Sequence, residues 1–206
     1  MVGEQNQRAS NEMVLRCAHG HFNAGIELMK SQFKQHVDTF ARYNAWANTR
    51  LLDAVGYLTD RQYKADRGAF FRSVHGTLNH LLVTDRIWMR RFTGEGEAPE
   101  RLDAILFDEF GALREARHAE DTRIIQYVSQ LDDERLQGTI SYRRVSTPEA
   151  ITQALAPGLS HWFNHQTHHR GQVHAILTGL VGKAPELDLL FYERLVKAGA
   201  ASGRAL

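Results

Sequence analysis

The stretch from Phe71 to Phe92 reads FRSVHGTLNHLLVTDRIWMRRF, and it decides the fold class of this chain. Large apolar side chains recur in it every three or four residues, which is the spacing of one face of an α-helix. They are Phe71, Val74, Leu78, Leu81, Leu82, Trp88, Met89 and Phe92. The polar strip that remains is narrow and consists of Arg72, Asn79, Arg86 and Arg90. We therefore expect a helix that is buried on most of its circumference and ends at Thr93-Gly94.

Two other segments show the same helical spacing. One covers residues 33–55 and ends before Gly56, a residue type that often follows the last turn of a helix. The other covers residues from about 108 to 131. Residues 114–123, in the middle of this second segment, are almost all charged or small. We expect that part to have an exposed face.

A short β segment is expected before the last helix. Residues 139–145 alternate in polarity and are rich in β-forming residues, which indicates a strand or a hairpin. The residues that follow have the pattern of a helix start, with Ser146 as the N-cap, Pro148 in the first turn and Glu149 closing a capping box. The sequence therefore predicts that the last helix begins directly after the β segment.

The last helix should extend to about residue 180, where Gly179 and Gly182 are expected to stop it. Pro157 and Gly158 lie inside it and should kink or interrupt it, because proline lacks the N–H that a helix needs. Four helices of roughly 20–30 residues with short or moderate links favour an all-α protein built as a four-helix bundle, with the short strand or hairpin before its last helix.

The composition excludes several classes of protein. The chain has 206 residues, a formal net charge of +1, one cysteine (Cys17) and eleven histidines. A single thiol cannot build a disulfide framework or a cysteine-rich zinc module. The small net charge argues against binding nucleic acid by phosphate neutralisation. Neither a secretory signal nor an apolar stretch long enough to span a membrane is visible, so we expect a cytoplasmic protein without membrane contact.

Histidines cluster in the last predicted helix, within HWFNHQTHH at residues 161–169. At about 100° per residue, His165 and His169 lie about 40° apart and one turn apart, so two imidazoles there can hold one cation. The spacing alone also allows the pairs His161/His165 and His165/His168. The apolar stripe of the helix favours His165 and His169, because these two lie nearest to it.

A third imidazole from the helix of residues 71–92 would complete a three-histidine metal site with one position open. His75 and His80 are both candidates, and the pattern leaves both open. The spacing of the histidine pair in the last helix equals that of the zincin motif His-Glu-x-x-His. Gln166 stands where the catalytic glutamate would be, and since an amide cannot accept a proton, the metalloprotease mechanism is not expected.

Three motifs resemble those of the DinB/YfiT-like family. They are YNAWANTRLL at residues 43–52, HGTLNHLLVTDRIW at residues 75–88 and NHQTHHRGQ at residues 164–172, and PELDLLF at residues 185–191 resembles the family's usual C-terminal segment. The resemblance covers about residues 29–195. It implies an up-down-down-up four-helix bundle that is often a homodimer. Residues 1–28 would then be an N-terminal extension, and residues 196–206 a C-terminal tail.

The resemblance also implies a set of metal ligands. In the family, one histidine of the second helix and an HxxxH pair of the fourth hold the metal, and the matching residues here are His80, His165 and His169. The histidines that match no ligand position are His75, His161, His168 and His174. Imidazole ligands suit Zn²⁺ or Ni²⁺ rather than Mg²⁺ or Ca²⁺. The candidates for hydrogen bonds that support the ligands are Asn44, Asn48, His75 and Gln172.

For function, the resemblance implies a divalent-metal-dependent enzyme that acts on a small molecule. Some relatives are thiol-dependent transferases, so S-transfer from a low-molecular-weight thiol is one expected reaction. The alternatives are a metal-dependent hydrolase and a non-catalytic, dimeric, metal-stabilised protein for binding or stress response. No general base is evident, because Asp85 follows His80 on the same predicted helix and is rotated well away from it.

Overall fold

The computed structural model describes residues 32–144, 147 and 149–202. The chain divides into two compact units, residues 1–36 and residues 37–206. In the described part of the first unit, residues 32–36 are helical, and the ring of Phe33 stacks on that of His36 with centroids 6.1 Å apart. The predicted extension at residues 1–28 lies outside the described residues. The elements and contacts discussed below belong to the second unit.

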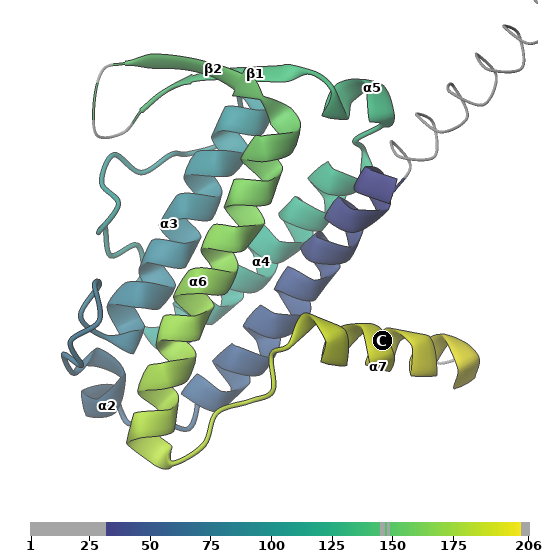
Figure 1. Ribbon diagram of the computed structural model, residues 1–206. Helices are drawn as coiled ribbons and strands as arrows, with labels where there is room; N and C mark the ends of the chain where they lie inside the picture. The colour runs from purple at the N-terminus through teal and green to yellow at the C-terminus, as the bar shows by residue number, and fades with distance from the viewer. Residues whose placement is uncertain (1–31, 145–146, 148, 203–206) are drawn as a thin grey trace, which may run out of the picture. The chain divides into compact units, whose positions relative to one another are not determined.

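Four long helices form the bundle of the second unit (Figure 1). They are the helix at residues 37–55, called helix 37–55 below, α3 (Val74–Thr93), α4 (Phe110–Ser129) and α6 (Leu155–Val181). The short helices α2 (Asp60–Lys64) and α5 (Asp133–Leu136) lie in the links, and α7 (Leu189–Ser202) follows α6. Among the described helices, none combines the length and the apolar character that a membrane span requires. The predicted all-α bundle is confirmed.

The link between α3 and α4 runs back along α3. Gly94 ends α3 with a φ of 78°, a left-handed conformation that glycine adopts without strain. The chain then passes His80, whose Nδ1 is 2.7 Å from the carbonyl oxygen of Leu102, and reaches Asn79, whose Oδ1 accepts the N–H of Phe107 at 3.0 Å. α4 therefore starts at the same end as α3 and runs parallel to it, in the up-down-down-up order (Figure 1). Asn79 is fully buried by this link, so its predicted place in a solvent-facing strip is wrong.

A β-hairpin precedes α6, as the sequence predicts. β1 (Thr139–Arg143) pairs antiparallel with β2 (Ala150–Ala154). The predicted helix start is wrong, because residues 150–154 pair with β1 and α6 begins only at Leu155. Ser146 and Pro148 lie outside the described residues. Glu149 caps no helix, and its carbonyl oxygen instead accepts the N–H of Arg144 at 3.2 Å.

Pro157 does not kink α6, contrary to the prediction. It lies in the first turn, where the backbone N–H has no helical partner to lose, and α6 continues unbroken to Val181. The helix also passes through Gly179 and ends at Gly182, which has a φ of 75°. Of the two glycines predicted to stop this helix, only Gly182 does so.

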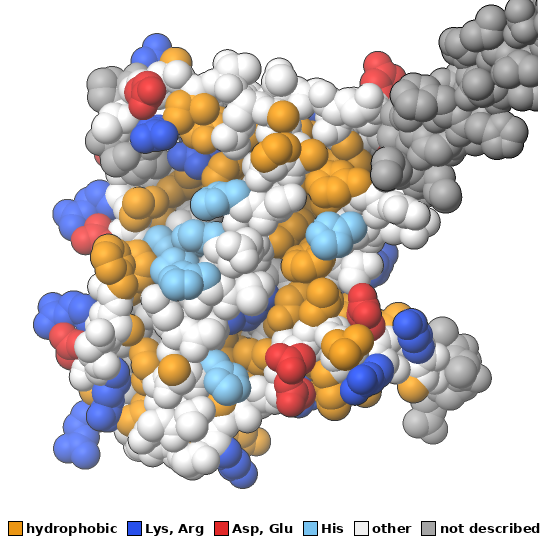
Figure 2. Space-filling view, viewed as in Figure 1, with side chains coloured by type: hydrophobic (Ala, Val, Ile, Leu, Met, Phe, Trp, Pro, Cys, Tyr) orange, Lys and Arg blue, Asp and Glu red, His pale blue; other side chains and the backbone are white. Residues whose placement is uncertain are grey.

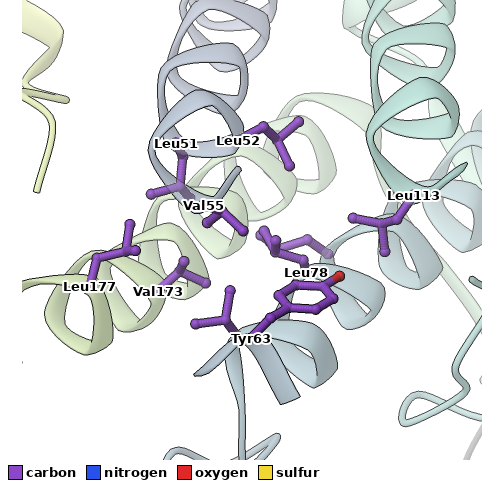
Figure 3. Packing of buried hydrophobic residues seen from close by; sticks show 10 residues of the cluster. Leu51, Leu52, Val55, Tyr63, Leu78, Leu113, Val173 and Leu177 are labelled. Carbon is purple, nitrogen blue, oxygen red and sulfur yellow. The ribbon is translucent and has the colours of Figure 1, made fainter. Parts of the chain in front are cut away.

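The core of the bundle lies where its four long helices meet. Figure 3 shows apolar side chains from each of them, and from α2, pointing toward one another. They include Leu51, Leu52, Val55, Tyr63, Leu78, Leu113, Val173 and Leu177, each at most 4% exposed. Burying such side chains contributes roughly 1.5–3 kcal/mol each. This packing fixes α3 beside α6, the two helices that carry the histidines.

Candidate metal centre

Three histidines from two helices converge between α3 and α6. His80 comes from α3, and His165 and His169 come from successive turns of α6. One ring nitrogen of each lies within 4.8 Å of those of the other two, and the Nε2 atoms of His80 and His165 are 3.4 Å apart. Histidine side chains gather on the face of the molecule over these two helices (Figure 2). The structure thus brings together the three residues that the sequence analysis places as ligands.

Hydrogen bonds fix the proton positions of two of these rings. Nδ1 of His80 faces the carbonyl oxygen of Leu102 at 2.7 Å, and Nδ1 of His169 faces Oε1 of Gln172 at 2.8 Å. Both oxygens only accept, so each Nδ1 carries the proton and donates it. In the neutral rings, both Nε2 atoms then hold lone pairs. Metal-binding histidines typically donate the N–H of their second ring nitrogen to an oxygen in this way.

All three imidazoles are disposed to be neutral. Burial, together with the nearby His169, lowers the pKa of His80 to about 4, although its bond to the Leu102 carbonyl acts in the opposite direction. Burial, together with the neighbouring histidines, lowers the pKa of His165 to about 3. Burial also lowers the pKa of His169, although its bond to Gln172 acts in the opposite direction. Neutral rings are the protonation state that binds metal.

The donor set fits a divalent transition metal. One ring nitrogen of each histidine is available as a ligand atom, and the three lie close enough together to bind a single ion. Nδ1 of His165 is buried and has no hydrogen-bond partner among the described residues. Three imidazoles suit zinc, nickel or a similar ion, and leave coordination positions for other ligands.

Comparison with known proteins decides the family. The sequence model described as the DinB family matches residues 29–200 of this chain. The chain belongs to the DinB family. Protein DinB of Bacillus subtilis (strain 168) is 26% identical over 141 residues, which cover 66% of this chain and 80% of that protein.

Two solved structures share the DinB fold of this chain. YfiT from Bacillus subtilis aligns with a TM-score of 0.56 and 17% identity, over 73% of this chain and 90% of YfiT. It is described as a probable metal-dependent hydrolase with an unusual four-helix bundle topology. A DinB-like protein from Bacillus cereus ATCC 10987 aligns with a TM-score of 0.54 and 15% identity, over 71% of this chain and 94% of that one.

The residues predicted to support the ligands of this DinB protein lie in different places. Gln172 contacts His169, as described above. The side chain of Asn44 accepts a hydrogen bond from Arg170, and Asn48 donates one to Asp121 at 2.9 Å, so both bond within the interior.

His75, the alternative third ligand, does not join the cluster. Its Nε2 lies 3.1 Å from the carbonyl oxygen of Phe107. The remaining histidines of α6 flank the three converging rings. The ring of His161 packs on Trp88 with centroids 5.5 Å apart, and Nε2 of His168 lies 3.3 Å from the side-chain nitrogen of Gln172.

α6 also carries side chains that bond to Asp85 rather than to the histidines. Gln166, which follows His165, donates a hydrogen bond to Asp85, and Nε1 of Trp162 donates one to the same carboxylate at 2.6 Å. Asp85 is fully buried and lies away from the three imidazoles, as its position after His80 indicates. Burial raises its pKa to about 6, while the charge of Arg117 acts in the opposite direction.

The predicted exposed face of α4 is wrong at three charged residues. Arg117 is 3% exposed, Glu120 is 7% exposed and Asp121 is 4% exposed. Arg117 forms ion pairs with Asp85 of α3 and, at 2.9 Å, with Asp121. We call Asp85, Arg117 and Asp121 the buried ion-pair network. The spacing of Arg117 and Asp121 by one turn is a signal for their pairing, but not for their burial.

Proposed function

We propose that this DinB protein is a divalent-metal-dependent enzyme that acts on a small molecule. The observation that carries the proposal is the convergence of three imidazoles, two of which are held by hydrogen bonds with their Nε2 lone pairs free. A purely structural zinc site usually fills its fourth position with a protein ligand. Among the described residues, no cysteine, aspartate or glutamate joins the three histidines.

The roles of the chain's own residues follow from their contacts. His80, His165 and His169 would hold the ion. The carbonyl oxygen of Leu102 and the side chain of Gln172 keep two of the rings in the required tautomer and orientation. When bound, the ion would supply a Lewis acid whose charge no carboxylate of the described residues neutralises, so an anionic group of the substrate is favoured there. We expect zinc or nickel in this role.

Two reaction classes suit such a site. In S-transfer, a low-molecular-weight thiol would provide the nucleophile as its thiolate, and the thiol proton would pass to the solvent. Hydrolysis is the second candidate, since the chain shares its fold with YfiT, which is described as a probable metal-dependent hydrolase. We further propose a homodimer, which the family resemblance implies, and a location in the cytoplasm.

Metal content of single variants tests the site. Purified protein without a histidine tag should bind about one zinc or nickel ion per chain. His80→Ala, His165→Ala and His169→Ala should each weaken binding by more than about tenfold, measured by competition with a chromophoric chelator. His161→Ala is the matched control, because this exposed residue lies one turn before His165 on the same helix. Unchanged affinity in all three ligand variants would contradict the site.

An activity panel then separates the functional classes. Metal-loaded protein is assayed with small thiols and a set of electrophiles, and separately with small esters and amides. Turnover that disappears with metal removal and in His169→Ala identifies the reaction class. If the protein holds its metal and turns over none of these substrates, the non-catalytic alternative of a metal-stabilised binding protein is favoured.

A further inference from the structure

Phe71, in the loop before α3, lies directly against the candidate ligands. Its ring stacks on that of His80, with centroids 3.7 Å apart and planes 18° apart. The same ring meets His169 edge-on, with centroids 5.5 Å apart. Phe71 therefore contacts imidazoles from both α3 and α6. The sequence pattern counts Phe71 among the apolar positions of a helix, but α3 begins only at Val74, so this side chain is free to fold over the site.

An unusual backbone conformation holds Phe71 in this position. Arg72 has a φ of 68° and is the one residue other than glycine with a positive φ in the described part of the chain. This conformation is unfavourable for a residue with a Cβ and persists only where the surroundings enforce it. Here the N–H of Arg72 donates to the carbonyl oxygen of Ala69 at 2.7 Å, and its own carbonyl oxygen accepts the N–H of Arg67 at 2.6 Å. Asp66 adds an ion pair with the Arg72 side chain at 2.8 Å.

Gly76, in the first turn of α3, makes room for this loop. A Cβ at Gly76 would lie 2.2 Å from the carbonyl oxygen of Phe71, a distance that real contacts do not reach. A side chain there would have to push the Phe71 backbone away. Three separate features act here: the positive φ of Arg72, the hydrogen bonds that hold it, and the absence of a side chain at Gly76. All of them maintain one position of Phe71.

We propose that Phe71 is a positioning and specificity-determining residue of the metal centre. By stacking on the His80 imidazole, its ring holds the orientation of that ligand. It also places an apolar surface next to two of the three ligands. The site then prefers substrates that carry an alkyl or aryl group next to the head group that binds the metal. This inference rests on the proposed function, since it requires a metal at the three histidines.

The surroundings of Phe71 mix apolar side chains with paired charges. Phe71 separates the three histidines from a cavity of about 550 Å³ that none of them lines, and Phe70 and Ile105 place exposed apolar side chains in that cavity. The charged side chains that line it already have partners. Arg72 pairs with Asp66, Lys64 pairs with Asp108, and Asp103 pairs with Arg101. Little charge is thus left to recognise an ionised substrate tail.

Cobalt-loaded protein provides the test, because the visible absorption of Co²⁺ reports both its ligand geometry and the binding of a thiolate. The wild type is titrated with phenylmethanethiol and with 2-mercaptoethanol. We expect the aryl thiol to bind about tenfold more tightly, through the apolar contact with Phe71. Phe71→Ala should abolish this preference and weaken cobalt binding by about tenfold.

Gly76→Ala is the sharper variant. It alters no side chain at the site and favours helix formation, yet it should reproduce the loss by displacing Phe71. Tyr57→Ala, which removes an aromatic ring that is 89% exposed elsewhere, is the control and should behave as the wild type. Phe71→Leu keeps an apolar side chain without the stacked ring. It should retain part of the thiol preference and lose cobalt affinity, and it serves if Phe71→Ala does not fold.

The outcomes separate the two levels of the proposal. An equal affinity of wild type for both thiols, or an unchanged preference in Phe71→Ala and Gly76→Ala, overturns the role of Phe71 while cobalt binding leaves the metal centre standing. If the wild type takes up no cobalt, zinc or nickel, the proposed function itself fails, and the inference fails with it.

Discussion

The three histidines differ in how their outer ring nitrogens are held. His80 and His169 each donate from Nδ1 to an oxygen atom that is fixed by the fold or by α6 itself. Nδ1 of His165 lacks a partner among the described residues. The orientation of the His165 ring therefore depends most on the ion, and we regard it as the ligand whose position changes most between metal-free and metal-loaded protein.

Acid should destabilise the metal-free protein. The pKa values of His80 and His165 fall from the ordinary 6.5 to about 4 and about 3 in the folded chain. Between pH 6.5 and about 4, the unfolded chain therefore binds protons that the folded chain does not, and the free energy of unfolding decreases as the pH falls. Burial shifts the pKa of Asp85 upward from 3.8 to about 6, which acts in the opposite direction between those two values, but it is a single group. Urea denaturation at pH 7.5, 6 and 5 measures the effect.

The control for this pH dependence is the double variant His80→Asn, His165→Asn. It lacks the two titrating rings, so its stability should change less between pH 7.5 and 5. A slope equal to that of the wild type would show that these histidines do not cause the acid sensitivity.

At the scale of elements, the two ends of α6 differ in how well local sequence signals predict them, because strand pairing overrides the signal at its start. The sequence pattern correctly indicates Gly182 as the C-terminal stop. It misplaces the start, because a capping pattern at residues 146–149 is a local signal and pairing with β1 is not. A proline kinks a helix only from an interior position. Because α6 starts at Leu155, Pro157 lies in its first turn and does not kink it.

Two glycines at the end of α6 should respond to alanine with opposite signs. Gly182→Ala should destabilise the protein by about 1 kcal/mol, because a Cβ is unfavourable at its φ of 75°. Gly179→Ala should stabilise it by about 0.5–1 kcal/mol, since Gly179 is helical and a Cβ there meets nothing within 4 Å. Thermal or urea unfolding of both variants checks the prediction. Equal effects of the two changes would contradict it.

At the scale of the whole molecule, periodicity predicts the bundle but not its polar interior. The apolar spacing of the helices and the order of the motifs are local features, and they indicated the fold and the His80, His165 and His169 cluster. The burial of Arg117 is different, because it depends on Asp85, a residue of another helix. A charged side chain looks exposed in a sequence until its distant partner is known. The bond from His80 to the Leu102 carbonyl has no sequence signal at all, since any residue supplies that oxygen.

The buried ion-pair network should be strongly coupled to stability. Asp85→Ala leaves Arg117 buried without its partner on α3, which should cost about 3–5 kcal/mol. Asp53→Ala is the matched control, because it removes a carboxylate from an exposed pair with Arg114 and should cost less than about 1 kcal/mol. Urea denaturation compares both with the wild type. A loss for Asp85→Ala no larger than that for Asp53→Ala would contradict a structural role of the network.

α6 makes two separate sets of contacts, and this separation bears on how the chemistry of the fold can change. Trp162 and Gln166 bond to Asp85, whereas His165 and His169 of the same helix lie against His80. The residues that would hold the ion are therefore not the ones that bond to Asp85, so the first set can change while the second, which ties α6 to α3, stays constant. A protein engineer can use the same separation, replacing one imidazole by a carboxylate or a thiolate to retune the ion without redesigning the scaffold.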